Sequence, residues 1–401
     1  MTASDPLLSF RSEFPILENT TYLISNSLGA MPRAAAAALA EYADTWATRG
    51  VRAWADSWWD MSVAVGDEIA PLIGASSGSL TMLPNVTVAA AVLLSSLEFR
   101  APRNRIVMID GEFPTVRYLV ETLGPRLGAE VVVVPSPHGD GMTADESRIR
   151  DAIDERTALV FLSHVLFKSA FVLDVPAVAE KCRREGALFA LDAYQSVGTI
   201  PVSVASLGVD VLLGGVLKWL CGGPGGAFLW VRPDLRPRLR PALTGWMAHP
   251  APFDFEPPPM RWRDDAFRFL LGTPAVPALY AAREGPRIVR RAGVDAIREK
   301  SLRQTTRLLE LLRARGFRSA TPRDVSRRGG TVAVDFEHAL EVSRELNARD
   351  VVVDFRPGAG IRMSPHFYTA DEELDRAFTA IDQIRASGAW ERWIDRPIVV
   401  T

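Results

Sequence analysis

The sequence predicts an α/β protein with a mostly parallel, seven-stranded sheet and a smaller α/β domain after it. From about residue 65 to 235, short runs of β-branched residues alternate with helical patterns. Alternation of this kind indicates a parallel sheet whose two faces are covered by helices. A proline-rich, irregular stretch over residues 232–275 interrupts the pattern, and a second series of helical and strand-like segments follows. This interruption predicts a second domain.

Seven apolar runs have the length of buried strands and are bounded by turn-forming residues. They are LTML (80–83), NRIVMI (104–109), EVVVV (130–134), TALVFLS (157–163), LFALD (188–192), VDVLLGG (209–215) and AFLWV (227–231). Amphipathic stretches such as VPAVAEKCRREG lie between several of them, with their charges on one helical face. Because sheets of this type bind ligands outside the carboxyl ends of their strands, functional residues are expected there.

The C-terminal part predicts a long helix, three strands and further helices. The long helical stretch runs from about 284 to 315, and a last helix lies near 371–386. The strand-like segments are GTVAVDF (330–336), VVVDF (351–355) and GIRMS (360–364), and EHALEVSRELNARD between the first two is helical. The first fifty residues predict an arm and one helix. The expected domains are therefore an arm over 1–60, a large domain over 61–283 and a small domain over 284–401.

Composition limits the class of function. With 46 basic against 48 acidic residues, nothing favours nucleic acid or an anionic membrane as partner. No apolar run approaches the roughly 20 residues that cross a bilayer, and MTASDPLLSFRSEFP lacks the order of a secretory signal. Cys182 and Cys221 supply neither a disulfide framework nor a metal-ligand cluster. We expect a soluble cytoplasmic protein without a metal site.

Few amines are available as nucleophiles, because the only lysines are Lys168, Lys181, Lys218 and Lys300. Lys218 differs from the others, since it ends the apolar run VDVLLGGVLKWL and precedes CGGPGG. Burial lowers the pKa of an amine and makes it competent to form a Schiff base. The alternative is a lysine whose ammonium reaches solvent from a strand end.

Two further residues suit a phosphorylated pyridine cofactor. Asp192 ends the strand LFALD, 26 residues before Lys218. Beside a pyridinium nitrogen it would keep the ring protonated, although it can also cap the next segment. Thr87 lies at the predicted helix start in PNVTVAAAVLL. Backbone N–H groups and a hydroxyl there suit a phosphate, although simple capping by Asn85 or Thr87 explains the pattern equally well.

Taken in order, the motifs resemble the kynureninase-like group of class-V aminotransferases, which are fold-type I enzymes dependent on pyridoxal phosphate (PLP). The resemblance covers roughly residues 20–385. It rests on NSLGAMP (26–32), NVT (85–87), FPT (113–115), LSHV (162–165), Lys218 before GGPG, GWMAH (245–249), RFLLGTP (268–274) and IRMSPHFYT (361–369). The resemblance implies PLP as cofactor, a small amino-acid substrate, and a homodimer with shared active sites.

The resemblance also implies roles for individual residues. Lys218 would form the Schiff base and move protons, and Asp192 would pair with the pyridinium nitrogen. The other cofactor contacts would be Val86, Thr87, Phe113, Ser163, Gln195, Trp246 and Thr273, the last from the neighbouring subunit. Arg362 would clamp the substrate carboxylate, for which a planar guanidinium is suited, and Asn26 would contact the substrate. Each residue alone is as readily structural, so the assignment depends on their joint order.

Four departures from the family pattern bear on the reaction. Gln195 replaces the histidine that is usual in the family. A glutamine at this position resembles the pattern of the cysteine desulfurases, where it donates a hydrogen bond to the oxygen on the cofactor ring. Leu217 replaces a tyrosine that contacts phosphate and is a proposed proton donor in kynurenine cleavage. Val116 replaces an aspartate, and Leu166 an asparagine. Because general acid–base help is worth ~10²–10⁴ in rate, these replacements argue against efficient kynurenine hydrolysis.

The favoured hypothesis is therefore cleavage at the β-substituent of an L-amino acid or amino-acid conjugate. Elimination of a thiolate or similar group is the expected form, in a biosynthetic pathway such as that of an antibiotic. Kynurenine hydrolysis to anthranilate and alanine, and decarboxylation coupled to oxidative deamination, are the alternatives. A non-catalytic relative is a further alternative, which the joint retention of Lys218, Asp192, Thr87 and Arg362 disfavours.

Overall fold

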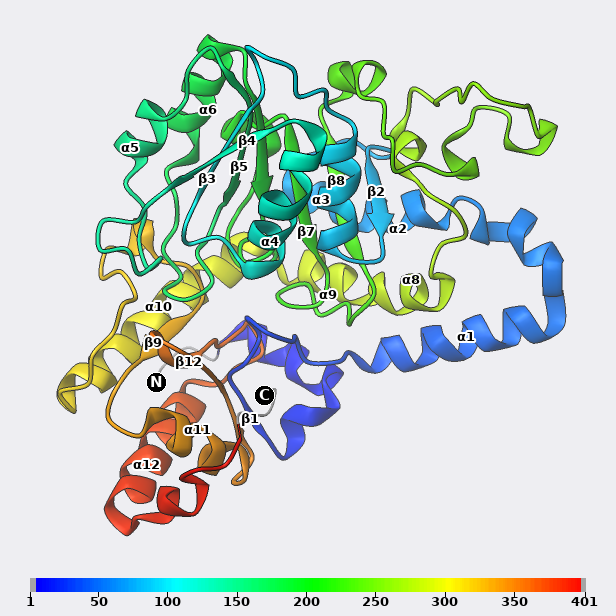
Figure 1. Cartoon of the computed structure of the whole chain (residues 1–401). Coiled ribbons are helices and arrows are strands. Elements are labelled where there is room, and N and C mark those ends of the chain that lie inside the picture. Colours follow the sequence, from blue (N-terminus) through cyan, green and yellow to red (C-terminus); the bar gives the residue numbers. More distant parts are fainter. Residues whose placement is uncertain (1–4, 398–401) are drawn as a thin grey trace.

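The seven predicted runs form one sheet in the computed structural model, which describes residues 5–397 (Figure 1). The strands lie in the order β2-β8-β7-β6-β5-β3-β4. Their bounds are β2 Leu80–Leu83, β3 Arg105–Ile109, β4 Glu130–Val134, β5 Thr157–Ser163, β6 Leu188–Asp192, β7 Val211–Gly215 and β8 Ala227–Val231. β8 is antiparallel to both β7 and β2, whereas β3 to β7 pair in parallel. The predicted mostly parallel sheet is confirmed.

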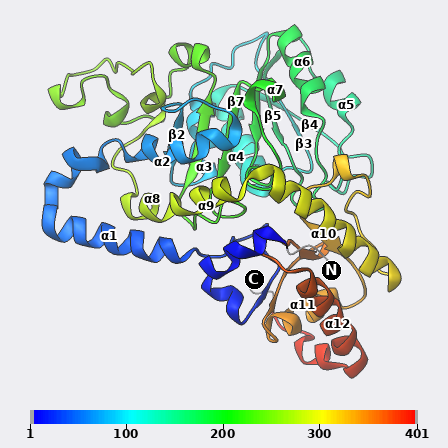
Figure 2. The same cartoon turned by 180° about the vertical axis from the view of Figure 1, so that it is seen from behind.

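Helices cover both faces of this sheet, which explains why the central positions of its strands are nearly all apolar. Ile106 and Met108 of β3 pack into a core with α3 and α4, whereas Val107 and Ile109 pack into a core on the opposite face with α5, α6 and α8. These helices are α3 Val86–Ser95, α4 Pro114–Leu123, α5 Glu146–Asp151, α6 Val175–Glu185 and α8 Val276–Ala282. Figures 1 and 2 show the two helical layers from opposite sides.

A second, three-stranded antiparallel sheet forms in the C-terminal part, in the order β11-β12-β9. Its strands are β9 Val332–Val334, β11 Asp354–Arg356 and β12 Gly360–Met363, and the helices that follow or connect them are α11 Ala339–Asn347 and α12 Asp371–Ser387. β1 (Thr21–Tyr22) pairs in parallel with β10 (Val351–Val352), so part of the N-terminal arm joins this region. The predicted smaller α/β unit is confirmed. The domain boundaries predicted after residues 60 and 283 stay a prediction.

Two predicted elements are divided in the structure. The strand predicted over 351–355 is split into β10 and β11, because the chain passes from one sheet to the other at Val353. The helix predicted over 284–315 is split into α9 (Glu284–Ala292) and α10 (Val294–Ala314). Gly293 separates them with φ 82°, a left-handed conformation that ends a helix.

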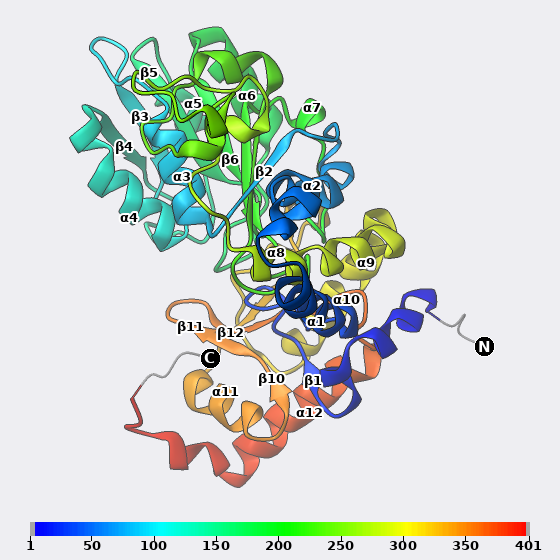
Figure 3. The ribbon, with the colours of Figure 1, turned by 90° about the vertical axis from the view of Figure 1, so that its right-hand side faces the viewer.

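The N-terminal helix α1 (Arg33–Arg49) lies beside α8, which is visible when the molecule is seen from the side (Figure 3). The loop between β1 and α1 therefore passes from the small sheet toward the large unit. Isolated pairing between Ile24 and Ser364 brings this loop next to the end of β12. Within residues 5–397, no helix combines the length and the apolar character that a membrane crossing requires.

Candidate active site

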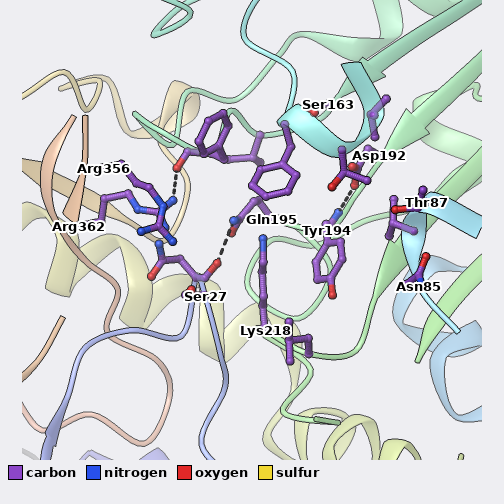
Figure 4. A pocket seen from close by; sticks show the side chains of 18 residues that line it. Ser27, Asn85, Thr87, Ser163, Asp192, Tyr194, Gln195, Lys218, Arg356 and Arg362 are labelled. Carbon is purple, nitrogen blue, oxygen red and sulfur yellow. Dashed lines mark hydrogen bonds between the residues drawn. The ribbon is translucent and has the colours of Figure 1, made fainter. Parts of the chain in front are cut away.

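The carboxyl ends of the parallel strands open into a cavity of about 310 Å³ (Figure 4). All predicted site residues except Trp246 and Thr273 line it. They are Asn26, Val86, Thr87, Phe113, Ser163, Asp192, Gln195, Lys218 and Arg362. These residues come from segments more than 300 positions apart. The strand ends of the large sheet, the N-terminal loop with Asn26 and the small sheet with Arg362 bring them together. Such a volume suits a small ligand or cofactor.

The amine of Lys218 projects into this cavity from the loop after β7. Its Nζ lies 5.4 Å from the ring centroid of Phe113 and 4.4 Å from that of Tyr194, so two aromatic rings flank it. Burial, reinforced by the cation of Arg362, lowers the pKa of Lys218 to about 7, although Asp192 acts in the opposite direction. A larger share of the amine is therefore neutral and nucleophilic near neutral pH.

Asp192 is the last residue of β6 and lies buried at the floor of the same cavity. Its Oδ1 accepts the backbone N–H of Tyr194 at 2.8 Å, so the capping interpretation also applies. Burial raises the pKa of Asp192 to about 6, while the Tyr194 N–H and Lys218 lower it. Because burial disfavours the charged form of this carboxylate, a neighbouring cation such as a pyridinium would stabilise it.

The first turn of α3 forms one end of the cavity. Asn85 caps this ten-residue helix, because its side chain accepts the N–H of Val88 at 3.0 Å. The hydroxyl of Thr87 is therefore not needed as the cap, and Asn85, Val86 and Thr87 all line the cavity. Helix starts present N–H groups to an anion, which suits a phosphate. Figure 4 shows Asn85 and Thr87 at the end remote from Arg356 and Arg362.

Gln195 is held at both ends of its amide. Its Nε2 donates to the backbone oxygen of Asn26 at 3.0 Å, and its Oε1 accepts from Nε1 of Trp219 at 2.9 Å. One N–H of Gln195 thus remains to donate to a ligand oxygen, as predicted for the ring oxygen. Trp219 lies immediately after Lys218 and anchors this arrangement in the core.

Ser163 is coupled to a second buried acid, Glu112. Glu112 accepts the backbone N–H of Ser163 at 2.9 Å, and its other oxygen contacts the Ser163 hydroxyl. Burial raises the pKa of Glu112 to about 8, the two contacts with Ser163 lower it, and the negative charge of Asp192 raises it further. Glu112 is therefore mostly protonated at neutral pH.

The other end of the cavity carries two arginines on one aspartate. Nε of Arg362 donates to Oδ1 of Asp354 at 2.8 Å, and its Nη2 contacts Oδ2. Nη2 of Arg356 lies 3.2 Å from the same Oδ2. Asp354 is completely buried, and Arg362 is 3% exposed. The sequence singled out Arg362 alone.

Sequence reasoning missed Tyr194, Glu112, Asp354 and Arg356. The pattern Asp-Phe-Arg two positions apart on one strand face, just before the predicted carboxylate motif, was a usable signal for the last two. No sequence signal pointed to Tyr194, because the position of its ring depends on a contact with Gly215 at the end of the neighbouring strand β7. A Cβ at Gly215 would lie 2.4 Å from the ring of Tyr194, so the glycine leaves the space that this ring occupies.

Trp246 and Thr273 do not line the cavity of the single chain. Trp246 is 41% exposed and packs edge-on against Trp59 and Phe253, with ring centroids 5.1 and 5.6 Å away. Thr273 is exposed as well. The contacts with the phosphate that were predicted for Trp246, and for Thr273 of a neighbouring subunit, therefore stay a prediction.

Sequence comparison identifies the family of this chain. Residues 21–376 match the family described as Aminotransferase class-V. This chain belongs to that family. Proteins named kynureninase are similar to it along nearly the whole length. The one from Burkholderia pseudomallei (strain 1106a) is 30% identical over 96% of this chain and 94% of its own. The one from Pseudomonas fluorescens is 31% identical over 97% and 95%.

Solved structures with the same fold lead to the same architecture. An apo cysteine desulfurase from Thermococcus onnurineus NA1 has a TM-score of 0.84 at 20% identity, covering 96% of this chain and 99% of its own. A cystine C–S lyase in complex with cysteine persulfide has a TM-score of 0.82 at 20% identity, covering 92% and 98%. At this identity these likenesses establish the fold, and the predicted fold-type I architecture is confirmed.

The protein is therefore a PLP-dependent enzyme, as the sequence predicted. The residues of the cavity fit this cofactor. Lys218 offers an amine for covalent attachment, and Asp192 a carboxylate for the pyridine nitrogen. The start of α3 offers N–H donors for the phosphate, and Phe113 an aromatic face for the ring. The interpretation as a non-catalytic relative is set aside.

Proposed function

We propose that this enzyme cleaves the bond between Cβ and a sulfur or similar leaving group of an L-amino acid or amino-acid conjugate. The observation that carries the proposal is the composition of the cavity wall. Leu217 and Val116 line the cavity with Lys218, where the family pattern has a tyrosine and an aspartate. Hydrolysis of kynurenine needs a water molecule and a proton donor near the bond that breaks, so the loss of polar groups at positions 217 and 116 disfavours it. Elimination is affected less, because it does not need a water molecule or a proton donor at these two positions.

PLP supplies an electron sink that stabilises negative charge at Cα of the bound substrate. The residues of the chain then have three tasks. Asp192 keeps the pyridine nitrogen protonated, and the arginine-lined end orients the substrate by its carboxylate. The amine of Lys218 takes the Cα proton and delivers a proton to the departing sulfur. With one water consumed, a cysteine S-conjugate would give a thiol, pyruvate and ammonium.

Two aromatic rings support the role of Lys218. Phe113 and Tyr194 flank its amine and limit the directions from which it can approach a substrate. Burial, reinforced by the negative charge of Asp192, raises the pKa of the Tyr194 phenol well above its usual range, so this side chain stays neutral and adds no charge beside the amine. The environment thus favours a lysine that exchanges protons at neutral pH.

The proposal includes a homodimer. Phe113, which faces the cavity, is 41% exposed in the single chain, and Trp246 is equally exposed. A partner subunit that contributes Trp246 and Thr273 would cover this side of the site. Sedimentation of the purified enzyme should give twice the mass of one chain, and a monomer that retains full activity would contradict this part.

A direct assay tests the reaction. The purified enzyme is incubated with S-methyl-L-cysteine, with a larger cysteine S-conjugate and with L-kynurenine, and release of thiol, pyruvate and anthranilate is measured. We expect thiol and pyruvate from an S-conjugate and little anthranilate. Lys218→Ala should abolish turnover and the absorbance of the bound cofactor. Lys168→Ala is the matched control, because Lys168 is outside the cavity wall and only reaches the backbone oxygen of Asp140 at 3.3 Å.

Kynurenine hydrolysis is the second candidate, because the relatives at 30–31% identity are named kynureninase. Anthranilate release at a rate comparable to that of an ordinary kynureninase would replace our proposal with this one. Carbon dioxide release with oxygen consumption would instead support decarboxylation coupled to oxidation.

A further inference from the structure

The side-chain amide of Gln195 has two orientations of the same shape, and only one of them suits a cofactor. Gln195 lines the cavity and is 8% exposed. With its nitrogen toward the ligand, the amide donates a hydrogen bond to an oxygen on the cofactor ring. With its oxygen toward the ligand, it repels that oxygen. Because the two orientations fill the same space, packing alone does not choose between them.

Two protein groups make this choice. Nε1 of Trp219 donates to Oε1 of Gln195 at 2.9 Å, and Nε2 of Gln195 donates to the backbone oxygen of Asn26 at 3.0 Å, a bond that Figure 4 marks with a dashed line. An indole N–H can only donate, and a backbone oxygen can only accept. A reversed amide would therefore face donor with donor at Trp219 and acceptor with acceptor at Asn26.

Trp219 is itself held in one position. Its side chain is 1% exposed, and Gly330 leaves space for the ring, since a Cβ there would lie 2.7 Å from Cη2 of Trp219. The backbone oxygen of Trp219 accepts a hydrogen bond from Nε2 of His366 at 2.8 Å. Burial, reinforced by the charge of Lys300, lowers the pKa of His366 to about 3, although the contact with Trp219 acts in the opposite direction. The imidazole is therefore neutral, with its proton on Nε2.

The indole lies behind Gln195, outside the cavity wall. We propose that Trp219 is a positioning residue of this enzyme, whose indole N–H fixes the amide of Gln195 so that this amide donates to the oxygen on the cofactor ring. Trp219 acts only through Gln195 and does not touch the cofactor. The inference concerns the cofactor and holds whichever bond of the substrate is cleaved, so it goes beyond the proposed function and does not depend on it.

The orientation of the amide has a measurable consequence. The oxygen on the ring shares the proton of the Schiff-base nitrogen at Lys218, and release of this proton changes the absorbance of the bound cofactor. A hydrogen bond from Gln195 stabilises the negative charge that remains on the oxygen when the proton leaves. Loss of this bond should therefore raise the pH of the absorbance change. The charged groups that also act on the amine of Lys218 are the same in every variant below: Asp192, Asp354, Arg356 and Arg362.

A pH titration of the cofactor absorbance tests the inference. Trp219→Phe keeps an aromatic ring and loses the N–H. Its midpoint should rise by about one pH unit, since a hydrogen bond to a charged oxygen is worth about that much. Gln195→Met removes the amide and should raise the midpoint at least as far. Trp58→Phe is the matched control, because Trp58 is buried outside the cavity wall and donates Nε1 to the hydroxyl of Tyr280 at 3.2 Å. Its midpoint should equal that of the wild type.

A double variant separates the orientation of the amide from the packing of the indole. If Trp219 acts through Gln195, Trp219→Phe adds no further shift to Gln195→Met. Thermal unfolding shows whether each variant is folded. If Trp219→Phe is not folded, a tryptophan analogue with sulfur in place of the indole nitrogen is inserted at position 219. This analogue keeps the ring, removes only the donor, and should give the same shift.

Every outcome decides the question. A wild-type midpoint in folded Trp219→Phe, or with the analogue, overturns the inference. A further shift in the double variant overturns it as well, because Trp219 would then act by packing. A wild-type midpoint in Gln195→Met would mean that Gln195 does not reach the ring oxygen, and the inference would also be overturned. None of these results bears on carbon–sulfur cleavage, which the thiol and pyruvate assay decides separately.

Discussion

Replacement of the buried acid Glu112 by glutamine should make the protein more stable at alkaline pH. Glu112 is 2% exposed, and its carboxyl contacts both the N–H and the hydroxyl of Ser163. Glutamine can keep both contacts, because its oxygen accepts the N–H and its amide donates to the hydroxyl. It carries no charge at any pH, and it therefore avoids the cost of burying a carboxylate.

The size and sign of the effect follow from the pKa of Glu112. Folding raises this pKa from 4.5 to about 8. The folded protein thus holds a proton that the unfolded chain releases, so wild-type stability falls as pH rises from about 4.5 to about 8. At 1.36 kcal/mol per pKa unit, the fall from this group reaches about 5 kcal/mol. In Glu112→Gln this contribution disappears.

Urea-induced unfolding at a series of pH values between 5 and 8.5 measures the difference. We expect similar free energies of unfolding at pH 5 and an advantage of several kcal/mol for Glu112→Gln at pH 8.5. Glu180→Gln, at a position whose side chain is 63% exposed, is the control and should follow the wild type at all pH values. A difference between Glu112→Gln and wild type that does not change with pH would refute the reasoning.

Three other changes have definite expectations. Asp192→Asn removes the carboxylate for the pyridine nitrogen, so kcat should fall at least ~10²-fold while cofactor absorbance shows that PLP is still bound. Leu217→Tyr returns a phenol to the cavity wall, and anthranilate release from kynurenine should rise ~10-fold or more; an unchanged rate would contradict the importance of this position. Arg362→Leu leaves the buried carboxylate of Asp354 with Arg356 as its one ion-pair partner among residues 5–397, and urea unfolding should show a loss of ~3 kcal/mol.

Much of the fold could be predicted because the pattern of apolar and charged residues within each short segment indicates whether that segment is a strand or a helix. The seven strand runs are apolar at consecutive positions, since both faces of the sheet are buried, and the helices between them have one charged face. The division at Gly293 was not predicted, because the helical pattern continues on both sides of it and only the backbone conformation at the glycine separates α9 from α10. The passage from β10 to β11 at Val353 was missed for a related reason, since a run of valines gives no sign of a change of sheet.

The sequence by itself determined the family, the cofactor, and the lysine and aspartate that meet in the cavity. Those residues lie in motifs that follow one another in a fixed order along the chain, and this order can be recognised from the sequence alone. Only the tertiary structure decided that Arg356 and Arg362 share the buried Asp354, that Glu112 lies against Ser163, and that Tyr194 reaches Lys218. These properties depend on which groups lie close together and how completely water is removed from them, and neither is encoded by spacing along the chain.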